Sequence, residues 1–143
     1  MKVRQISIFM ENRSGRLASV LKEVARAGVN IRALSLADTS DFGILRLIVD
    51  NVDACVKALR ETGHTVSLTE VLAVEVPDRP GGLAGILEAL SEAKMNVEYM
   101  YAFVSRATEK AMVVFRFERI DEAIEALRKA GVSVVDAQTV YSL

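Results

Sequence analysis

The stretch Glu11-Asn12-Arg13-Ser14-Gly15-Arg16-Leu17 decides the fold, because it recurs at positions 77–83 as Pro77-Asp78-Arg79-Pro80-Gly81-Gly82-Leu83. In each copy a short apolar run ends at this stretch, and an amphipathic run that begins with a leucine follows it. This order predicts a strand, a tight loop and a helix. The offset of 66 (77 − 11) also relates the preceding apolar positions, Ile6, Ile8 and Met10, to Leu72, Val74 and Val76. We therefore predict that the chain is an internal duplication.

The duplication divides the 143 residues into two halves of nearly equal size. With 51% hydrophobic and 26% charged residues, the composition is that of an ordinary soluble globular protein. A half of roughly 70 residues is close to the size at which a single core is only marginally sufficient. No linker rich in Pro, Gly or Ser separates the halves. We predict two domains, at residues 1–70 and 71–143, that are tightly coupled.

Charge and cysteine content exclude several classes of function. The formal net charge is −1 and the pI is near 5.9, with acidic and basic residues interspersed, so we expect no nucleic-acid partner. The single cysteine, Cys55, excludes an intrachain disulfide and a multi-thiolate metal site, and it fits a reducing compartment. No export signal follows Lys2 and Arg4, and no apolar run approaches the length of a membrane span. We expect a cytoplasmic protein without membrane, metal or cofactor.

The first half predicts the element order βαββαβ. Alternation predicts a strand over 2–10, and three- and four-residue spacing predicts a helix over 15–27 that Ser14 can cap. The remaining predicted elements are a hairpin over 30–38 and 42–50, a helix from Val52 that stops at Gly63, and a strand over 65–69. We predict an α+β, ferredoxin-like fold. Its four-stranded antiparallel sheet carries both helices on one face and leaves the other face open.

The second half repeats this order. We predict strands at 71–76, 97–104, 110–117 and 133–139, and helices at 81–93 and from Ile120 to near Gly131. The hairpin connection 105–109 is two residues longer than its counterpart, so the second helices match at an offset of 68 (120 − 52).

The repeated loop has the chemistry of a small-anion site. A strand that enters a helix across a glycine brings unpaired backbone N–H groups and the positive helix end to one point, where a carboxylate is the natural guest. Asn12 offers a carbonyl oxygen that could hold an amino group beside it. Asn30 opens the next strand, and Asp78 and Asn96 are the counterparts in the second half. The alternative is that these glycines serve only the turn and that the asparagines bind their own backbone.

With βαββαβ twice and the loops ENRSGRL and PDRPGGL, the chain resembles the ACT domain family of regulatory amino-acid-binding modules. Residues 8–31, IFMENRSGRLASVLKEVARAGVNI, resemble the regulatory domain of bacterial phosphoglycerate dehydrogenase, where serine binds between two modules. The resemblance implies a non-catalytic tandem ACT protein, a homodimer formed through its modules, and an amino acid held at ACT–ACT interfaces. Which amino acid binds is not implied.

The resemblance also implies the site residues. In the first module the ligand would meet the loop, and residues from an apposed module would complete the site; the second module repeats this arrangement. The implied residues are Asn12, Arg13, Ser14, Gly15, Arg16, Leu17, Asn30 and Ile31 in the first half, and Asp78, Arg79, Pro80, Gly81, Gly82, Leu83, Asn96 and Val97 in the second.

Several other functions share this topology. An acylphosphatase-like enzyme would use Arg13 or Arg79 as a phosphate clamp, but no recognisable acylphosphatase loop is present, and His64 has no nucleophile placed beside it by sequence. RNA-binding modules stack bases on aromatic residues, for which only Phe115 and Phe117 alternate suitably; core packing is the competing interpretation. A copper carrier needs a pair of cysteines in the first loop, and this chain has one cysteine, Cys55, which lies outside that loop.

Two alternatives therefore stay open beside the free-standing sensor. One is a regulatory subunit of an amino-acid biosynthetic enzyme, like the small subunit of acetolactate synthase. The other is an interaction module that binds no ligand.

Overall fold

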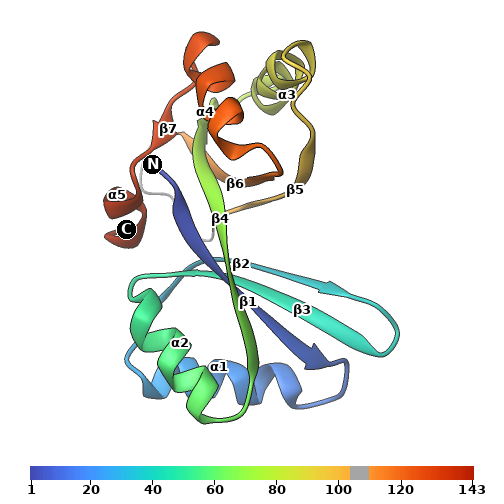
Figure 1. Cartoon of the computed structure of the whole chain (residues 1–143), viewed down its shortest axis with the longest axis vertical. Coiled ribbons are helices and arrows are strands. Elements are labelled where there is room, and N and C mark those ends of the chain that lie inside the picture. The colour runs from blue at the N-terminus through green and yellow to red at the C-terminus, as the bar shows by residue number, and fades with distance from the viewer. Residues whose placement is uncertain (104–109) are drawn as a thin grey trace.

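The computed structural model describes residues 1–103 and 110–143 (Figure 1). The predicted hairpin connection 105–109 and the end of the predicted strand 97–104 lie outside the described residues. The described elements are, in chain order, β1 (Val3–Glu11), α1 (Arg16–Arg26), β2 (Ile31–Asp38), β3 (Phe42–Val49), α2 (Val52–Glu61), β4 (Thr65–Val76), α3 (Gly82–Glu92), β5 (Val97–Ala102), β6 (Ala111–Phe117), α4 (Ile120–Lys129), β7 (Val134–Val135) and α5 (Ala137–Tyr141).

The first half folds into a ferredoxin-like unit. Its strands lie in the order β2-β3-β1-β4 and all pairs are antiparallel. One face of this sheet packs on α1 and α2, because the apolar stripes of both helices meet alternate residues of the strands. The buried core between them includes Ile6, Leu47, Val24 and Leu59. We call β1 to α2, together with residues 65–71 of β4, the first unit.

The second half repeats this arrangement with the remainder of β4. Residues 72–76 of β4 lie between β6 and β7, and β5 pairs with the outer edge of β6. Its core includes Leu72, Ile86, Phe115 and Leu127, from strands and from α3 and α4. We call residues 72–143 the second unit. The predicted α+β fold class, with repeated βαββαβ units and antiparallel sheets, is confirmed.

One continuous strand joins the two units. β4 runs from Thr65 to Val76, so the strand predicted to close the first half and the strand predicted to open the second are one element. Figure 1 shows β4 passing from the sheet beside α1 and α2 to the sheet beside α3 and α4. The continuous strand leaves no flexible connection between the units.

The prediction that residues 133–139 form a strand is wrong. β7 contains only Val134 and Val135, and α5 follows it. In a strand, alternate backbone groups point to the same edge. On β4, the Glu75 backbone amide donates to the Ser133 carbonyl, beside β7, at 3.0 Å. Val71 points to the same edge of β4, where it is paired with Val3 of β1. Because β1 already occupies this edge, β7 cannot extend and the chain leaves the sheet.

The prediction that the second face of each sheet is open is also wrong over much of its area. Those two faces pack against each other and form a buried apolar layer between the units. Figure 1 shows the helix pairs on the outside, with the strands between them. Each unit thereby gains a larger core than its size alone provides. The members of this layer are Val3, Ala33, Ile48, Val71, Ala73, Met112, Val114, Val135 and Val140.

A polar cluster lies at the same interface. Gln5 is 0% exposed; its side-chain nitrogen donates to Tyr99 Oη at 2.7 Å and to Ser7 Oγ at 3.2 Å, and its oxygen accepts from Tyr101 Oη at 2.6 Å. The Arg46 guanidinium stacks on the Tyr99 ring, 3.8 Å from its centroid. We call these five residues the Gln5 cluster. Burial raises the pKa of Tyr101, so its hydroxyl keeps its proton at neutral pH and donates to Gln5.

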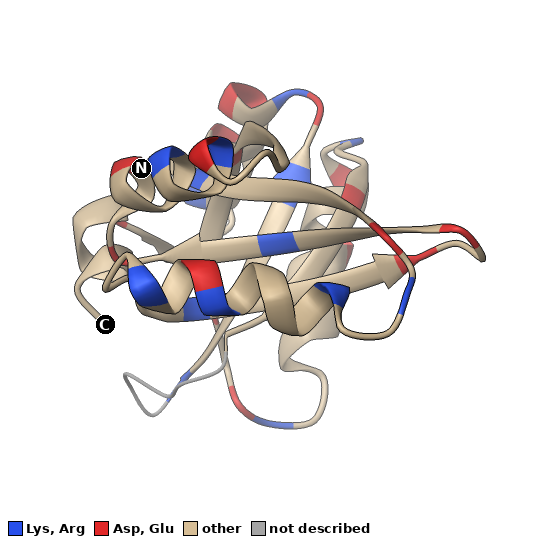
Figure 2. Ribbon diagram, turned by 90° about the horizontal axis from the view of Figure 1, so that it is seen from below, with Lys and Arg blue, Asp and Glu red and all other residues tan. Residues whose placement is uncertain are grey.

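Charged residues are interspersed over the outer surface. Figure 2 shows acidic and basic positions interspersed over the ribbon, in agreement with the sequence. Several form ion pairs one helical turn apart, such as Arg26 with Glu23 at 2.6 Å and Arg128 with Glu125 at 3.1 Å. Because these pairs are largely exposed, each contributes little to stability.

Candidate functional site

The first repeated loop turns β1 into α1. Gly15 has φ 86°, a left-handed conformation that a glycine adopts without strain, and it is the N-cap of the helix. The Arg13 amide donates to the Glu11 carbonyl at 2.9 Å, and the Arg16 amide donates to the Arg13 carbonyl at 3.2 Å. The predicted Ser14 cap is wrong: no side chain of the described residues caps α1, because the turn at Gly15 delays the helix start to Arg16.

The second loop has the same backbone hydrogen bonds. The Arg79 amide donates to the Pro77 carbonyl at 2.9 Å, the Gly82 amide donates to the Arg79 carbonyl at 3.0 Å, and Gly81 has φ 83°. The two loops therefore share one conformation as well as one sequence pattern. They differ at Gly82, where a Cβ atom would lie 2.0 Å from the Pro77 carbonyl oxygen. The first loop carries Arg16 at the equivalent position, so its backbone is less closely packed there.

Both loops leave backbone donors unpaired at the start of the following helix. Within the described part of the chain, no acceptor is paired with the amides of three residues in each loop. These residues are exposed or half-buried, and they lie where the helix dipole is positive. A carboxylate or another small anion would satisfy such donors. The residues are Gly15, Leu17 and Ala18 in the first loop, and Gly81, Leu83 and Ala84 in the second.

Asn12 fastens the first loop to the turn between β2 and β3. Its backbone amide donates to the Asp41 carbonyl at 2.9 Å, and its side-chain nitrogen donates to the Thr39 carbonyl at 3.1 Å. The side-chain oxygen of Asn12 accepts no hydrogen bond from the described residues. Asp78 stands at the equivalent position of the second loop and lines a shallow pocket there with Arg79 and Pro80.

Asn30 lies at the opposite end of the first unit. Its side-chain oxygen accepts from the Ile31 amide at 2.9 Å, and its own amide donates to Asp50 Oδ1 at 2.9 Å. Asn12 contacts Asp41 before β3, whereas Asn30 contacts Asp50 after β3. The eight residues of β3 separate the two asparagines by roughly 26 Å. In the second unit, Asn96 and Val97 likewise stand at the start of β5, away from the second loop.

A small cavity adjoins each loop, where the helix start meets the turn that leads into the last strand of the unit. The cavity of the first unit has a volume of about 270 Å³ and that of the second about 300 Å³. Neither is lined by Asn30 or Asn96. The first is lined by Phe9, Met10, Glu11, Arg16, Val20, Phe42, Gly63, His64 and Thr65. The second is lined by Glu75, Pro77, Arg79, Gly81, Gly82, Gly85, Ile86, Ala89, Lys110, Ala130, Gly131, Val132 and Ser133.

Each cavity carries both signs of charge. In the first, the hydrogen bond from Arg13 and then the charge of Arg16 lower the pKa of Glu11, which therefore stays ionised. In the second, Lys110 lies 3.4 Å from Glu75, and Arg79 also lines the wall. Sequence reasoning missed the wall formed by the second turn. The offset of 68 that aligns the turns at Gly63 and Gly131 was the available signal.

The residues behind the competing functions have structural roles. Phe115 and Phe117 are buried and stack with ring centroids 5.9 Å apart in the core of the second unit, so they offer no surface for bases. Cys55 is buried in the core of the first unit, as the apolar spacing predicts. His64 lines the first cavity. Among the described residues, no group of acidic, His or Cys side chains could hold a metal, and no helix is long and apolar enough to cross a membrane.

Comparison with known proteins agrees with this architecture. Residues 1–143 match the family described as the ACT domain pair. The solved structure of protein BT0572 from Bacteroides thetaiotaomicron is similar, with a TM-score of 0.92 and 40% identity over 100% of this chain and 98% of that one. A comparison with curated proteins gave no match.

More distant structures share the fold. The regulatory subunit of aspartate kinase from Thermus flavus has a TM-score of 0.60 and 16% identity over 90% of this chain and 92% of that one. The ligand-free regulatory subunit of aspartate kinase from Thermus thermophilus has a TM-score of 0.61 and 19% identity over 89% of this chain and 91% of that one. The match from residue 1 to residue 143 confirms the resemblance found in the sequence: the chain belongs to the ACT domain pair family.

Proposed function

We propose that this protein is a non-catalytic regulatory protein that binds an amino acid at interfaces between ACT modules. The proposed modules are residues 1–70 and 71–143, and the proposed location is the cytoplasm. The observation that carries the proposal is the set of amides at Gly15, Leu17 and Ala18, repeated at Gly81, Leu83 and Ala84, that have no acceptor within the part of the chain that the structure describes. Three donors at the positive end of a helix suit the carboxylate that every free amino acid carries.

The loops also carry groups suited to the ammonium end of the ligand. The side-chain oxygen of Asn12, in the same loop as the first set of amides, accepts no hydrogen bond from residues 1–103 and 110–143, while the nitrogen of the same side chain binds the Thr39 carbonyl. Asp78 offers an acceptor at the equivalent point of the second loop. The proposed contacts in the first loop come from residues 12–17, and those in the second come from residues 78–83.

The ligand site needs a second module. Asn30 and Ile31 lie roughly 26 Å from Asn12 within one unit, a distance that no single amino acid spans. If the start of β2 contributes to the site, it must come from a module of another copy apposed to the loop. The proposal therefore includes a homodimer, in which Asn96 and Val97 play the corresponding part for the second loop.

A regulatory subunit of an amino-acid biosynthetic enzyme is the second candidate. It is favoured by the solved regulatory subunits of aspartate kinase, which are separate chains of nearly the same length and fold. In that case the bound amino acid would bias the packing of a catalytic partner through its different affinity for two arrangements. Co-purification of an enzyme with the tagged protein would favour this candidate over a free-standing sensor.

A thermal-shift screen against the proteinogenic amino acids tests the proposal. With few contacts, a dissociation constant of roughly micromolar to millimolar is reasonable. Ligand at 100 times that constant stabilises the folded state by ~2.7 kcal/mol, which raises Tm by roughly 5–10 °C for a chain of this size. If no amino acid moves the midpoint, the sensor proposal fails and a ligand-free interaction module remains.

Two Asp variants, each with an Asn control, locate the site. A Cβ at Gly15 or Gly81 meets no atom within 4 Å, and both Asp and Asn tolerate left-handed backbone, so the substituted loops should fold. Gly15→Asp and Gly81→Asp place a carboxylate beside the unpaired amides and should abolish the shift at their own loop. Gly15→Asn and Gly81→Asn have the same shape without the charge and should retain most of it. If ligand still raises Tm in both Asp variants, the ligand does not bind at these loops.

A further inference from the structure

The C-terminal helix α5 departs from the repeat, because its counterpart in the first unit is a continuous strand. β1 blocks the edge of β4 along which β7 would extend, and the chain therefore crosses from the second unit to the first. The contacts of α5 decide what this crossing does.

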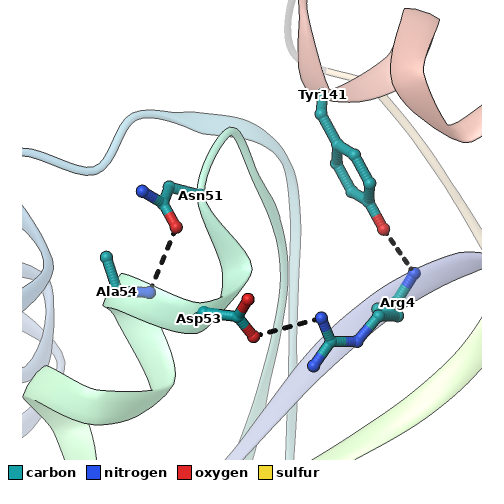
Figure 3. Close-up of polar contacts among 5 residues, drawn as sticks. All are labelled: Arg4, Asn51, Asp53, Ala54 and Tyr141. Carbon is teal, nitrogen blue, oxygen red and sulfur yellow. Dashed lines mark hydrogen bonds and ion pairs between the residues drawn. The ribbon is translucent and has the colours of Figure 1, made fainter.

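Tyr141 binds the first unit at two points. Its hydroxyl accepts from the Arg4 backbone amide at 2.9 Å (Figure 3). Arg4 pairs with Glu70 of β4, but the pairing of β1 with β3 begins only at Ile6, so no residue of β3 is paired with Arg4. The Tyr141 carbonyl accepts from Arg32 Nε at 3.3 Å and Nη2 at 3.2 Å. One residue near the end of the second unit thus binds the backbone of β1 and the Arg32 side chain of β2.

Val140 adds an apolar contact. Its side chain is 0% exposed and lies in the layer between the units with Val3 and Ile48, which belong to the first unit. The cores that α1 and α2 form in the first unit, and α3 and α4 in the second, do not include Val140. The Tyr141 ring, half-buried, packs against the edge of the first core. Release of α5 would therefore expose mainly the interface between the units, together with the part of the first core that Tyr141 covers.

We propose that α5 is an intramolecular clasp, which holds the sheet of the first unit against the second unit and can open while both helical cores stay folded. Arg32, which the clasp contacts, directly follows Asn30 and Ile31 at the start of β2. Through Arg32, α5 therefore connects the start of β2 in the first unit to the second unit. The proposal does not depend on whether an amino acid binds there.

Hydrogen exchange of the full chain tests the clasp. Tyr141→Phe keeps the ring and removes the hydroxyl, so exchange at the Arg4 amide should become about tenfold faster, while exchange at Ile6 stays unchanged. Val140→Asp should drive α5 out of the apolar layer, with a larger increase at Arg4 and a larger radius of gyration in solution. Ser142→Asp adds the same charge at an exposed neighbour and should change neither quantity.

Two results would overturn the proposal. Unchanged exchange at Arg4 in both variants would mean that α5 does not hold the first unit. Equal loss of protection throughout both helical cores in Val140→Asp would mean that α5 is part of one cooperative core and not a clasp.

Discussion

Replacement of Gln5 by leucine should destabilise the protein more than any other conservative change at the interface between the units. Gln5 is fully buried, and its three hydrogen bonds to Tyr99, Tyr101 and Ser7 are 2.6–3.2 Å long. Leucine fills a similar volume but leaves the two tyrosine hydroxyls without their partner. An unsatisfied buried polar group costs about 1–3 kcal/mol; because both tyrosines are half-buried, we expect a combined loss of about 3 kcal/mol in the free energy of unfolding for the two hydroxyls.

Urea denaturation followed by circular dichroism measures this loss, and a thermal melt should show Tm lower by roughly 10 °C. Gln138, the other glutamine of the chain, is exposed, and Gln138→Leu should stay within about 0.5 kcal/mol of the natural protein. This control separates the burial of Gln5 from a general effect of the substitution.

A double-mutant cycle with Tyr101→Phe tests whether the cluster acts as a unit. Tyr101→Phe alone removes the 2.6 Å bond and should cost about 1.5 kcal/mol. The double variant should cost about 1.5 kcal/mol less than the sum, because each single change already breaks the shared bond. Additive losses, or a loss below 1 kcal/mol for Gln5→Leu, would refute the expectation that the Gln5 cluster acts as one hydrogen-bonded unit.

Two further predictions concern the helices. Gly82→Ala should lower the free energy of unfolding by more than 2 kcal/mol, because its Cβ would lie 2.0 Å from the Pro77 carbonyl oxygen. Gly85→Ala, where no described atom lies within 4 Å of the added Cβ, should raise it by about 0.5–1 kcal/mol. Urea denaturation measures both changes, and equal effects would contradict the close approach at Gly82. Burial, with a smaller effect of Asp50, raises the pKa of the Cys55 thiol from 9.0 to about 11, so the unfolded chain loses its proton first. The free energy of unfolding of the natural protein, relative to that of Cys55→Ala, should therefore be constant below about pH 9 and fall by up to ~1.4 kcal/mol per pH unit between pH 9 and 11. Denaturation at each pH measures this difference. A difference that does not change with pH would contradict the burial of the thiol.

Local patterns in the sequence were sufficient for the architecture of each unit. The alternation around Ile6 and Ile8 and the helical spacing of Val20 and Val24 depend on which face of a single element is buried, and the structure buries those faces. The repeat at positions 11 and 77 predicted a strand, a tight loop and a helix in each copy, which the structure confirms. The ligand residues assigned to those loops stay a prediction.

Other features depend on contacts between segments far apart in the chain. The alternation of the first strand predicts that Gln5 lies on its exposed face. Gln5 is buried because the second unit covers that face with Tyr99 and Tyr101. The separation of Asn12 from Asn30 follows from the pairing of β2 with β3, which no spacing in the sequence encodes.

The sequence by itself determined the duplication, the order of the elements, the core stripes and the glycine loops, because each is set by the periodicity and backbone preferences of neighbouring residues. The tertiary structure alone decided where the two units meet and how the chain ends. The strand predicted over 133–139 begins with Val134 and Val135, but the edge that the residues after Val135 would need on β4 is already filled by Val3. Competition for one strand edge is a property of the assembled sheet, and it turned a predicted strand into α5.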